Sequence, residues 1–183
     1  MNIFILSECP VKAAQLQCDK HVIKMIVESA QMLSTAHRML DGVQEHRKSK
    51  SGMRVVKYWA LQDEREELFY KAVHTGHPCT VWTCESVANY QWHYEHFVAL
   101  CDEYTYRYGK VHRSDTLLRE ALARTPERLL RENRTPFKLA MGANPECMSE
   151  DPVKSYRAFY QTKQDRFSMV WTAREVPEWF TYA

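Results

Sequence analysis

The longest regular pattern of apolar positions lies near the start of the chain. Between Val11 and about Leu40 there is neither Gly nor Pro. Apolar residues recur there at intervals of three and four: Val22, Ile23, Ile26, Val27, Ala30 and Leu33. This spacing gathers apolar side chains on one helical face, so it predicts a long helix. Gly42 ends the predicted helix.

A second long helix is predicted from Pro78 to Gly109. Its apolar face comprises Trp82, Val87, Tyr90, Phe97, Leu100 and Cys101. The segment YTYRYGK (104–110) alternates as an exposed strand would. The residues before it have a helical period, however, and Gly109 suits a helix C-terminus, so we predict a helix end. Tyr104 and Tyr108 then share one face, with Arg107 beside it.

Shorter elements are predicted between and after the two long helices. Residues 43–53 are polar without periodicity and predict a flexible loop, whereas residues 55–73 predict a short or broken helix. Helical segments are also predicted over 113–123, from Pro126, and from Asp151-Pro152 to about Gln164. An aromatic tail, 174–183, closes the chain. These elements predict one all-α domain over residues 1–183, built on the two long helices.

Composition supports a globular protein and excludes several classes. The chain has 183 residues, of which 45% are hydrophobic and only 5 are Gly, which disfavours a turn-rich β-sandwich or barrel. No apolar run approaches the ~18 residues of a membrane span. The first ten residues lack the basic region of a signal peptide, and the six cysteines form no CxxC pair. We therefore expect a cytoplasmic protein with reduced thiols and no membrane partner.

Positive charge concentrates in one segment although the net charge is only +2. Residues 110–138 hold eight Lys or Arg against four Asp or Glu. Such a segment is compatible with phosphate contact, and equally with a solvated helix face.

The first predicted helix carries a polar stripe among apolar neighbours. His21, Lys24, Glu28, Gln31 and Thr35 are spaced by three or four and align along one side. A stripe on an otherwise apolar helix faces solvent, a cleft, or partners in the core. In a cleft, Glu28 beside Lys24 and His21 would be an acid–base group with a tunable pKa. The alternative is a solvent-facing stripe with an ordinary Lys–Glu pair.

Polar residues on the second predicted helix offer a binding face. His77 stands at its start, and Asn89 and His93 follow on one side, where Asn89 could read a base edge or a sugar. His93 and His96 lack the further ligand that a metal site requires, so no metal is expected. Hydrogen-bonded histidines in the core are the alternative. No Gly-rich phosphate loop or GxSxG motif is present, and no cofactor is expected.

Aromatic side chains lie next to cations in two places. Tyr104, Arg107, Tyr108 and Lys110 form one group, and Trp179 belongs to the C-terminal tail. Aromatic faces stack on unpaired nucleobases, and cations contact phosphates. These residues therefore predict contact with DNA or a nucleotide, with packing in the core as the alternative.

Four stretches in order, MNIF, CDKHVIKMIVESAQ, HPCTVWTCESVANYQWHYEHFVALCDEYTYRYGK and PEWFTYA, give a family resemblance. The chain resembles the phage-type pyrimidine-dimer DNA glycosylases, the endonuclease V family, over less than half of its length. The resemblance implies an all-α enzyme of phage origin that acts in the host cytoplasm. Such enzymes flip a nucleotide out of the duplex, cleave its glycosidic bond and nick the strand through a Schiff base.

The resemblance also implies roles for individual residues. The family's nucleophile is the α-amino group of a processed N-terminus, assisted by a glutamate on the first helix. Glu28 suits the role of that glutamate best, and Asp19 comes next. The family's amine belongs to a small second residue, whereas Asn2 is large, so we expect Met1 to be retained. Either the Met1 amine then serves, or water attacks with Glu28 as base.

These observations predict a DNA glycosylase-like enzyme that acts on a damaged or modified pyrimidine. In this interpretation Lys24 and His21 shift the pKa of Glu28 or contact a phosphate. Two other functions remain open: a non-catalytic protein that binds a nucleotide or nucleic acid, and an enzyme acting on a free or hypermodified pyrimidine nucleotide.

Overall fold

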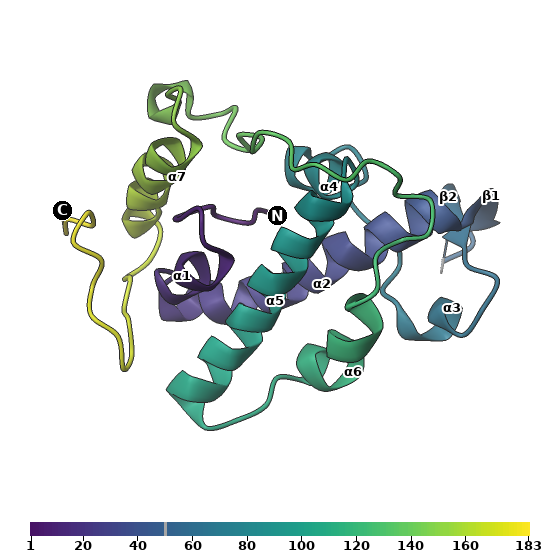
Figure 1. Cartoon of the computed structure of the whole chain (residues 1–183), viewed down its shortest axis with the longest axis horizontal. Coiled ribbons are helices and arrows are strands. Elements are labelled where there is room, and N and C mark those ends of the chain that lie inside the picture. The colour runs from purple at the N-terminus through teal and green to yellow at the C-terminus, as the bar shows by residue number, and fades with distance from the viewer. Residues whose placement is uncertain (50) are drawn as a thin grey trace.

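Two long helices, α2 (Asp19–Asp41) and α5 (Val87–Tyr108), cross near the middle of the molecule (Figure 1). The computed structural model describes residues 1–49 and 51–183. The buried side of α2 comes from the apolar positions that the sequence pattern identified, among them Val22, Ile26 and Leu33, which are 0% exposed. The two long helices were therefore predicted correctly as the centre of the fold.

Each predicted long helix is divided by a short break. The first consists of α1 (Pro10–Gln15) and α2, and the second of α4 (Pro78–Thr83) and α5. At the first break the Cys18 N–H donates to the Tyr160 hydroxyl at 2.8 Å. At the second the Ser86 side chain caps α5 by accepting from the Asn89 N–H at 3.1 Å. The hydroxyl groups of Tyr160 and Ser86 thus accept from backbone N–H groups that a continuous helix would have paired within itself.

The smaller helices lie around this pair. They are α3 (Arg65–Leu68), α6 (Arg113–Leu122) and α7 (Pro152–Gln161), with 3₁₀ turns η1 (Pro145–Cys147) and η2 (Thr162–Asp165). The predicted start of α7 is confirmed, because the Asp151 carboxylate caps it through the Val153 and Lys154 N–H groups. The short helix predicted from Pro126 is a turn instead.

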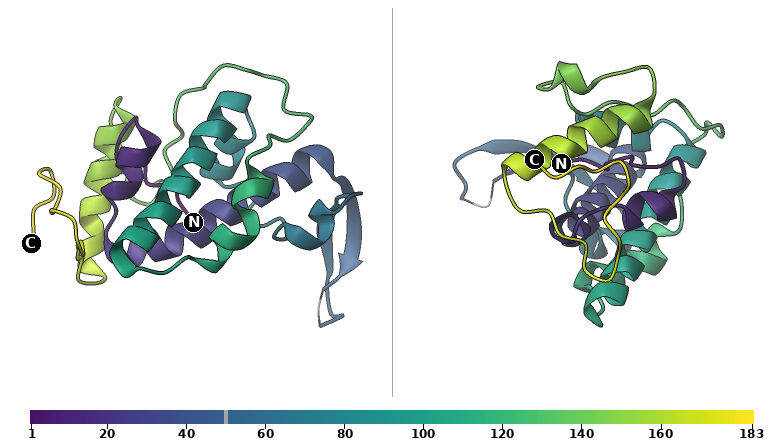
Figure 2. Two further views of the ribbon diagram at one scale, coloured as in Figure 1. Left: turned by 60° about the horizontal axis from the view of Figure 1, so that its bottom comes forward. Right: turned by 90° about the vertical axis from the view of Figure 1, so that its left-hand side faces the viewer.

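The prediction of an all-α fold is wrong. The described residues form seven α-helices and two 3₁₀ turns, which together make up 48% of the chain, and a two-stranded antiparallel sheet. Strands β1 (Val43–Lys48) and β2 (Val55–Ala60) pair from Val43 opposite Ala60 to Lys48 opposite Val55. The loop predicted over 43–53 is therefore a strand over 43–48, and the helix predicted from residue 55 begins as a strand over 55–60; residue 50 of that predicted loop lies outside the described residues. The hairpin projects from the end of the molecule opposite the C-terminal tail, as the left view of Figure 2 shows.

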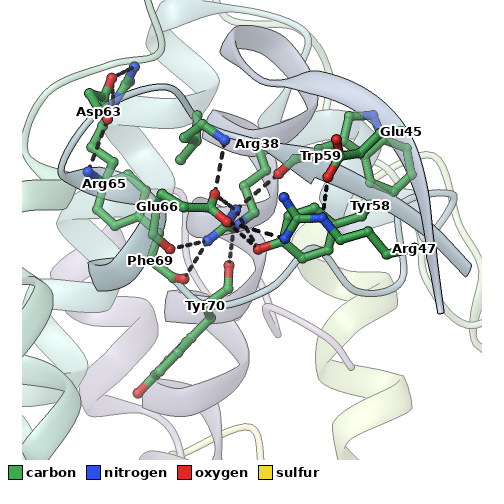
Figure 3. Close-up of polar contacts among 11 residues, drawn as sticks. Arg38, Glu45, Arg47, Tyr58, Trp59, Asp63, Arg65, Glu66, Phe69 and Tyr70 are labelled. Carbon is green, nitrogen blue, oxygen red and sulfur yellow. Dashed lines mark hydrogen bonds and ion pairs between the residues drawn. The ribbon is translucent and has the colours of Figure 1, made fainter. Parts of the chain in front are cut away.

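A buried arginine ties this hairpin to the helices (Figure 3). Arg38 on α2 is 1% exposed, and its guanidinium pairs with the Glu66 carboxylate at 2.6 Å. It also donates to the Tyr58 hydroxyl and to the backbone carbonyls of Trp59, Glu66, Phe69 and Tyr70. All five N–H donors of the guanidinium are used, so the cluster holds the fold together and has no free donor for a ligand.

Four histidines lie in the core: His21, His37, His93 and His96. Burial is the main cause that lowers the pKa of His21 to about 3 and the pKa values of His37 and His96 to about 4. Burial also lowers the pKa of His93 well below its ordinary range. These imidazoles are therefore neutral in the folded protein at physiological pH. Among the described residues no group of three or more His, Cys, Asp or Glu is placed to hold a metal ion.

Stability is expected to fall as the pH drops from about 6.5, the ordinary pKa of histidine, towards 4. In that range the unfolded chain binds protons at these imidazoles while the folded chain does not, so acid favours unfolding. Each histidine costs up to about 3 kcal/mol by pH 4, against a usual domain stability of roughly 5–15 kcal/mol. Urea unfolding between pH 7 and pH 4 measures this, and a constant free energy of unfolding over that range would contradict it.

Within residues 1–49 and 51–183, no helix combines the length and the apolar character needed to cross a bilayer.

Candidate active site

The first residues of the chain run into the interior and place the N-terminus beside α2 (Figures 1 and 2). Ile3, Ile5 and Leu6 are at most 1% exposed. The buried Asn2 side chain donates to the Ala140 carbonyl at 3.2 Å and accepts from the Phe4 N–H at 2.9 Å. Phe4 itself has a positive φ of 55°, an uncommon conformation for a side chain of this size. The apolar run near the start thus fixes the position of the terminal amine.

Three nitrogen atoms lie around the Glu28 carboxylate. Its Oε2 lies 3.6 Å from the Met1 nitrogen and accepts from the Asn2 backbone N–H at 3.0 Å. Its Oε1 lies 3.4 Å from Nζ of Lys24, one helical turn earlier. The Glu28 side chain is 13% exposed, so it is largely but not fully enclosed. The structure therefore brings together three of the predicted catalytic residues, Met1, Lys24 and Glu28.

The N-terminal residue is also held on the side of α4. The Met1 side chain is 4% exposed, and its sulfur lies 4.0 Å from Oγ1 of Thr80. Near it, the Nδ1 atom of His77 accepts from the Cys79 N–H at 3.2 Å and so caps α4. Burial lowers the pKa of His77, and the terminal ammonium lowers it further, although Glu28 acts in the opposite direction. A neutral imidazole next to the amine adds no competing positive charge.

Asp19 and His21, on the same helix, do not join this site. The Asp19 carboxylate accepts from Arg107 at 2.8 Å and from the Thr172 hydroxyl at 2.6 Å. It lies nine residues before Glu28, which is about 13 Å along a helix. The buried His21 ring contacts the Tyr160 hydroxyl through Nδ1 at 2.8 Å. Of the two acids considered for the catalytic role, only Glu28 lies at the amine.

Arg107 lies in a buried ionic network rather than on the surface. Its side chain is 0% exposed and pairs with Asp19 at 2.8 Å and with Glu103 at 2.7 Å. Arg174 of the tail pairs with Glu103 at 2.8 Å. The network joins α2, α5 and the C-terminal tail, so the predicted contact between Arg107 and nucleic acid has no exposed guanidinium to support it.

The rest of the YTYRYGK segment ends α5 as predicted, with Gly109 in the left-handed conformation at φ 62°. The Tyr104 and Tyr108 rings share a face with centroids 5.0 Å apart, and Tyr104 also packs on His112. Lys110 follows on the surface. These three residues stand at the end of α5, where no contact joins them to Glu28.

The remaining predicted binding residues pack in or near the core. Asn89 is 0% exposed and donates to the Trp82 carbonyl and to the Thr135 hydroxyl, each at 2.7 Å. Nδ1 of the buried His93 contacts the Thr83 hydroxyl at 2.7 Å. The half-buried Trp179 packs on Tyr160 with ring centroids 6.1 Å apart. Their hydrogen bonds and packing give these side chains structural roles.

The sequence pattern did not identify Asn2 as a residue that positions the amine. Its signal is slight: one polar residue immediately before the apolar run IFIL, residues 3–6. In the structure, residues 3–6 are buried and form no strand.

The chain matches no known protein-family model, no curated protein and no solved structure. What supports a function is therefore the geometry around Glu28.

Proposed function

We propose that the protein is a DNA glycosylase-like enzyme that acts on a damaged or modified pyrimidine, with the α-amino group of Met1 as nucleophile. One observation carries this proposal: the Met1 nitrogen lies 3.6 Å from the Glu28 carboxylate, which the Asn2 N–H orients at 3.0 Å. An amine held beside a carboxylate is the arrangement that activates an amine nucleophile. Lys24, whose side chain is 63% exposed, neutralises part of the carboxylate charge.

The reaction follows from the amine and the carboxylate. The unprotonated amine attacks C1′ of the deoxyribose, and a nitrogen–carbon bond forms as the glycosidic bond breaks. The base leaves with the bonding electron pair and takes up a proton. The sugar ring then opens: the C1′–O4′ bond breaks, O4′ takes the proton that Glu28 received from the amine, and an iminium ion is left between Met1 and the sugar. Glu28 accepts the proton of the amine and stabilises the positive charge that develops on the sugar.

The Met1 side chain is part of the packed interior. A methionine that is 4% exposed and packed against Thr80 contributes to the core, and its removal would leave a cavity there. With Met1 in place, the Asn2 nitrogen is a peptide N–H that orients Glu28, and the Met1 nitrogen is the amine. Intact mass spectrometry of the purified protein checks this assignment.

A panel of duplex oligonucleotides tests the proposed function. The panel contains an abasic site, a thymine dimer, and oxidised and hypermodified pyrimidines. We expect base release from at least one damaged or modified duplex, and an adduct that borohydride traps. Base release without any adduct would assign water as the nucleophile, with Glu28 as its base. No turnover of any member would contradict the enzymatic proposal and favour a binding protein.

A further inference from the structure

Lys163 is a lysine whose side chain is largely buried while its ammonium group reaches the surface. It belongs to η2 and is 8% exposed, and its Nζ lies 3.4 Å from the centroid of the Phe159 ring. In the part of the chain that the structure describes, no carboxylate lies within ion-pair distance of this ammonium and no acceptor takes its hydrogen bonds. An ammonium carries three N–H donors, and the face of an aromatic ring compensates only part of its charge. Nζ is not among the side-chain atoms that are fully buried without a partner, so this ammonium reaches the surface and can bind an anion there.

The charged groups around Lys163 are mainly positive. Burial lowers the pKa of Lys163, and the nearby charges of Arg166 and Lys24 lower it further. Arg166 is exposed and, among the described residues, has no carboxylate partner. Lys24 pairs with Glu28 alone in the same set, and Lys20 lies 4.7 Å from the centroid of the Phe167 ring. Arg166 directly follows η2, and its backbone N–H donates to the Lys163 carbonyl at 3.1 Å. Lys163 lies over Phe159, and the Phe4 ring links Phe159 to His21, which stands one helical turn before Lys24 on α2.

Aromatic rings form the floor beneath these cations. The Phe4 ring packs on Phe159 at 6.2 Å and on His21 at 4.6 Å, and Phe167 packs edge-on against His21 at 5.3 Å, all between ring centroids. The His21 ring stays neutral, because burial and the charges of Lys24 and Lys163 lower its pKa. An apolar floor screens charge poorly, so an anion above it is attracted more strongly than on an open surface.

We propose that Lys163, Lys24 and Arg166 form a binding subsite for a phosphate group beside Glu28. The identity of that phosphate rests on the proposed function: it is a phosphodiester of the strand, next to the target nucleotide. Lys24 joins the two sites: its Nζ lies 3.4 Å from Glu28 Oε1, and it stands one helical turn after His21, whose ring packs on the Phe4–Phe159 pair beneath Lys163. The same chemistry would bind the 5′-phosphate of a free nucleotide, and the test separates these two sources.

The test compares Lys163→Met with Lys57→Met. Lys57 is an exposed lysine on β2, in the hairpin at the far end of the molecule, so both variants lose one charge and gain the same side chain. Binding of a short duplex, of thymidine monophosphate and of inorganic phosphate is measured between about 50 and 200 mM salt. We expect Lys163→Met to weaken duplex binding about tenfold or more and to reduce the salt slope by about one, with Lys57→Met unchanged.

Equal affinities and salt slopes for Lys163→Met and Lys57→Met would overturn the proposal. Should Lys163→Met fail to fold, Arg166→Met decides, because Arg166 is exposed and the fold does not depend on it. A loss seen for thymidine monophosphate and inorganic phosphate as well as the duplex assigns the 5′-phosphate, and a loss confined to the duplex assigns the strand.

The Glu28→Gln variant distinguishes phosphate binding from the proposed base release. That variant leaves the three cations in place, so we expect it to bind the duplex at least as tightly as the wild type even where base release is lost. If the phosphate subsite is found but the wild type turns over no substrate, only the proposed function is contradicted.

Discussion

Replacing Glu28 with Gln is expected to slow base release by roughly 100-fold or more. The amide has the shape of the carboxylate and still accepts from the Asn2 N–H, which donates to Glu28 at 3.0 Å in the wild type. It carries no negative charge, however, so it neither takes the proton of the Met1 amine nor stabilises positive charge on the sugar. Single-turnover base release on the best substrate of the panel measures the effect.

Glu67→Gln is the matched control for this experiment. Glu67 is an exposed glutamate on α3, so the variant loses the same charge away from the amine. We expect it to release base at the wild-type rate. Equal rates for the two variants on every substrate would exclude Glu28 as the acid–base group.

Replacing Arg38 with Met is expected to lower the free energy of unfolding by about 3–5 kcal/mol. The change leaves the Glu66 carboxylate without its 2.6 Å ion pair and four backbone carbonyls without their donor. Buried acceptors that lose both a partner and water are costly. The hairpin and α3 would loosen first, because Arg38 binds residues of both elements from its position on α2.

Urea unfolding at neutral pH measures this loss, and Arg54→Met is the control. Arg54 is an exposed arginine next to β2, and its replacement is expected to change stability by less than about 0.5 kcal/mol. A loss for Arg38→Met no larger than that of the control would show that the cluster does not support the fold.

The apolar spacing was enough to predict α2 and α5 but not their ends. The breaks at Cys18 and Ser86 depend on a tyrosine hydroxyl 142 residues away and on a capping serine. The hairpin was missed because β1 exposes five of its six residues, which leaves no alternation of buried and exposed positions to detect. A strand that is exposed on both faces has the composition of a loop.

At the candidate site, the spacing of the polar stripe was enough to predict that Glu28 and Lys24 lie together. The family resemblance ranked Glu28 before Asp19, and the position of the amine beside Glu28 depends on where the N-terminal segment meets the helix. Arg107 was expected on the surface since its partner Asp19 is 88 residues away in sequence. Lys163 was not considered because a lysine near the end of an amphipathic helix usually projects into solvent.

Mapping the borohydride-trapped adduct is the most direct test of the central claim, that the amine at Glu28 is the nucleophile. The protein is reacted with its best duplex substrate under borohydride, digested, and sequenced by mass spectrometry. We predict a sugar adduct on the α-amino nitrogen of Met1, which lies 3.6 Å from Glu28. An adduct on a lysine side chain such as Lys24 or Lys163, with Met1 unmodified, would contradict the claim.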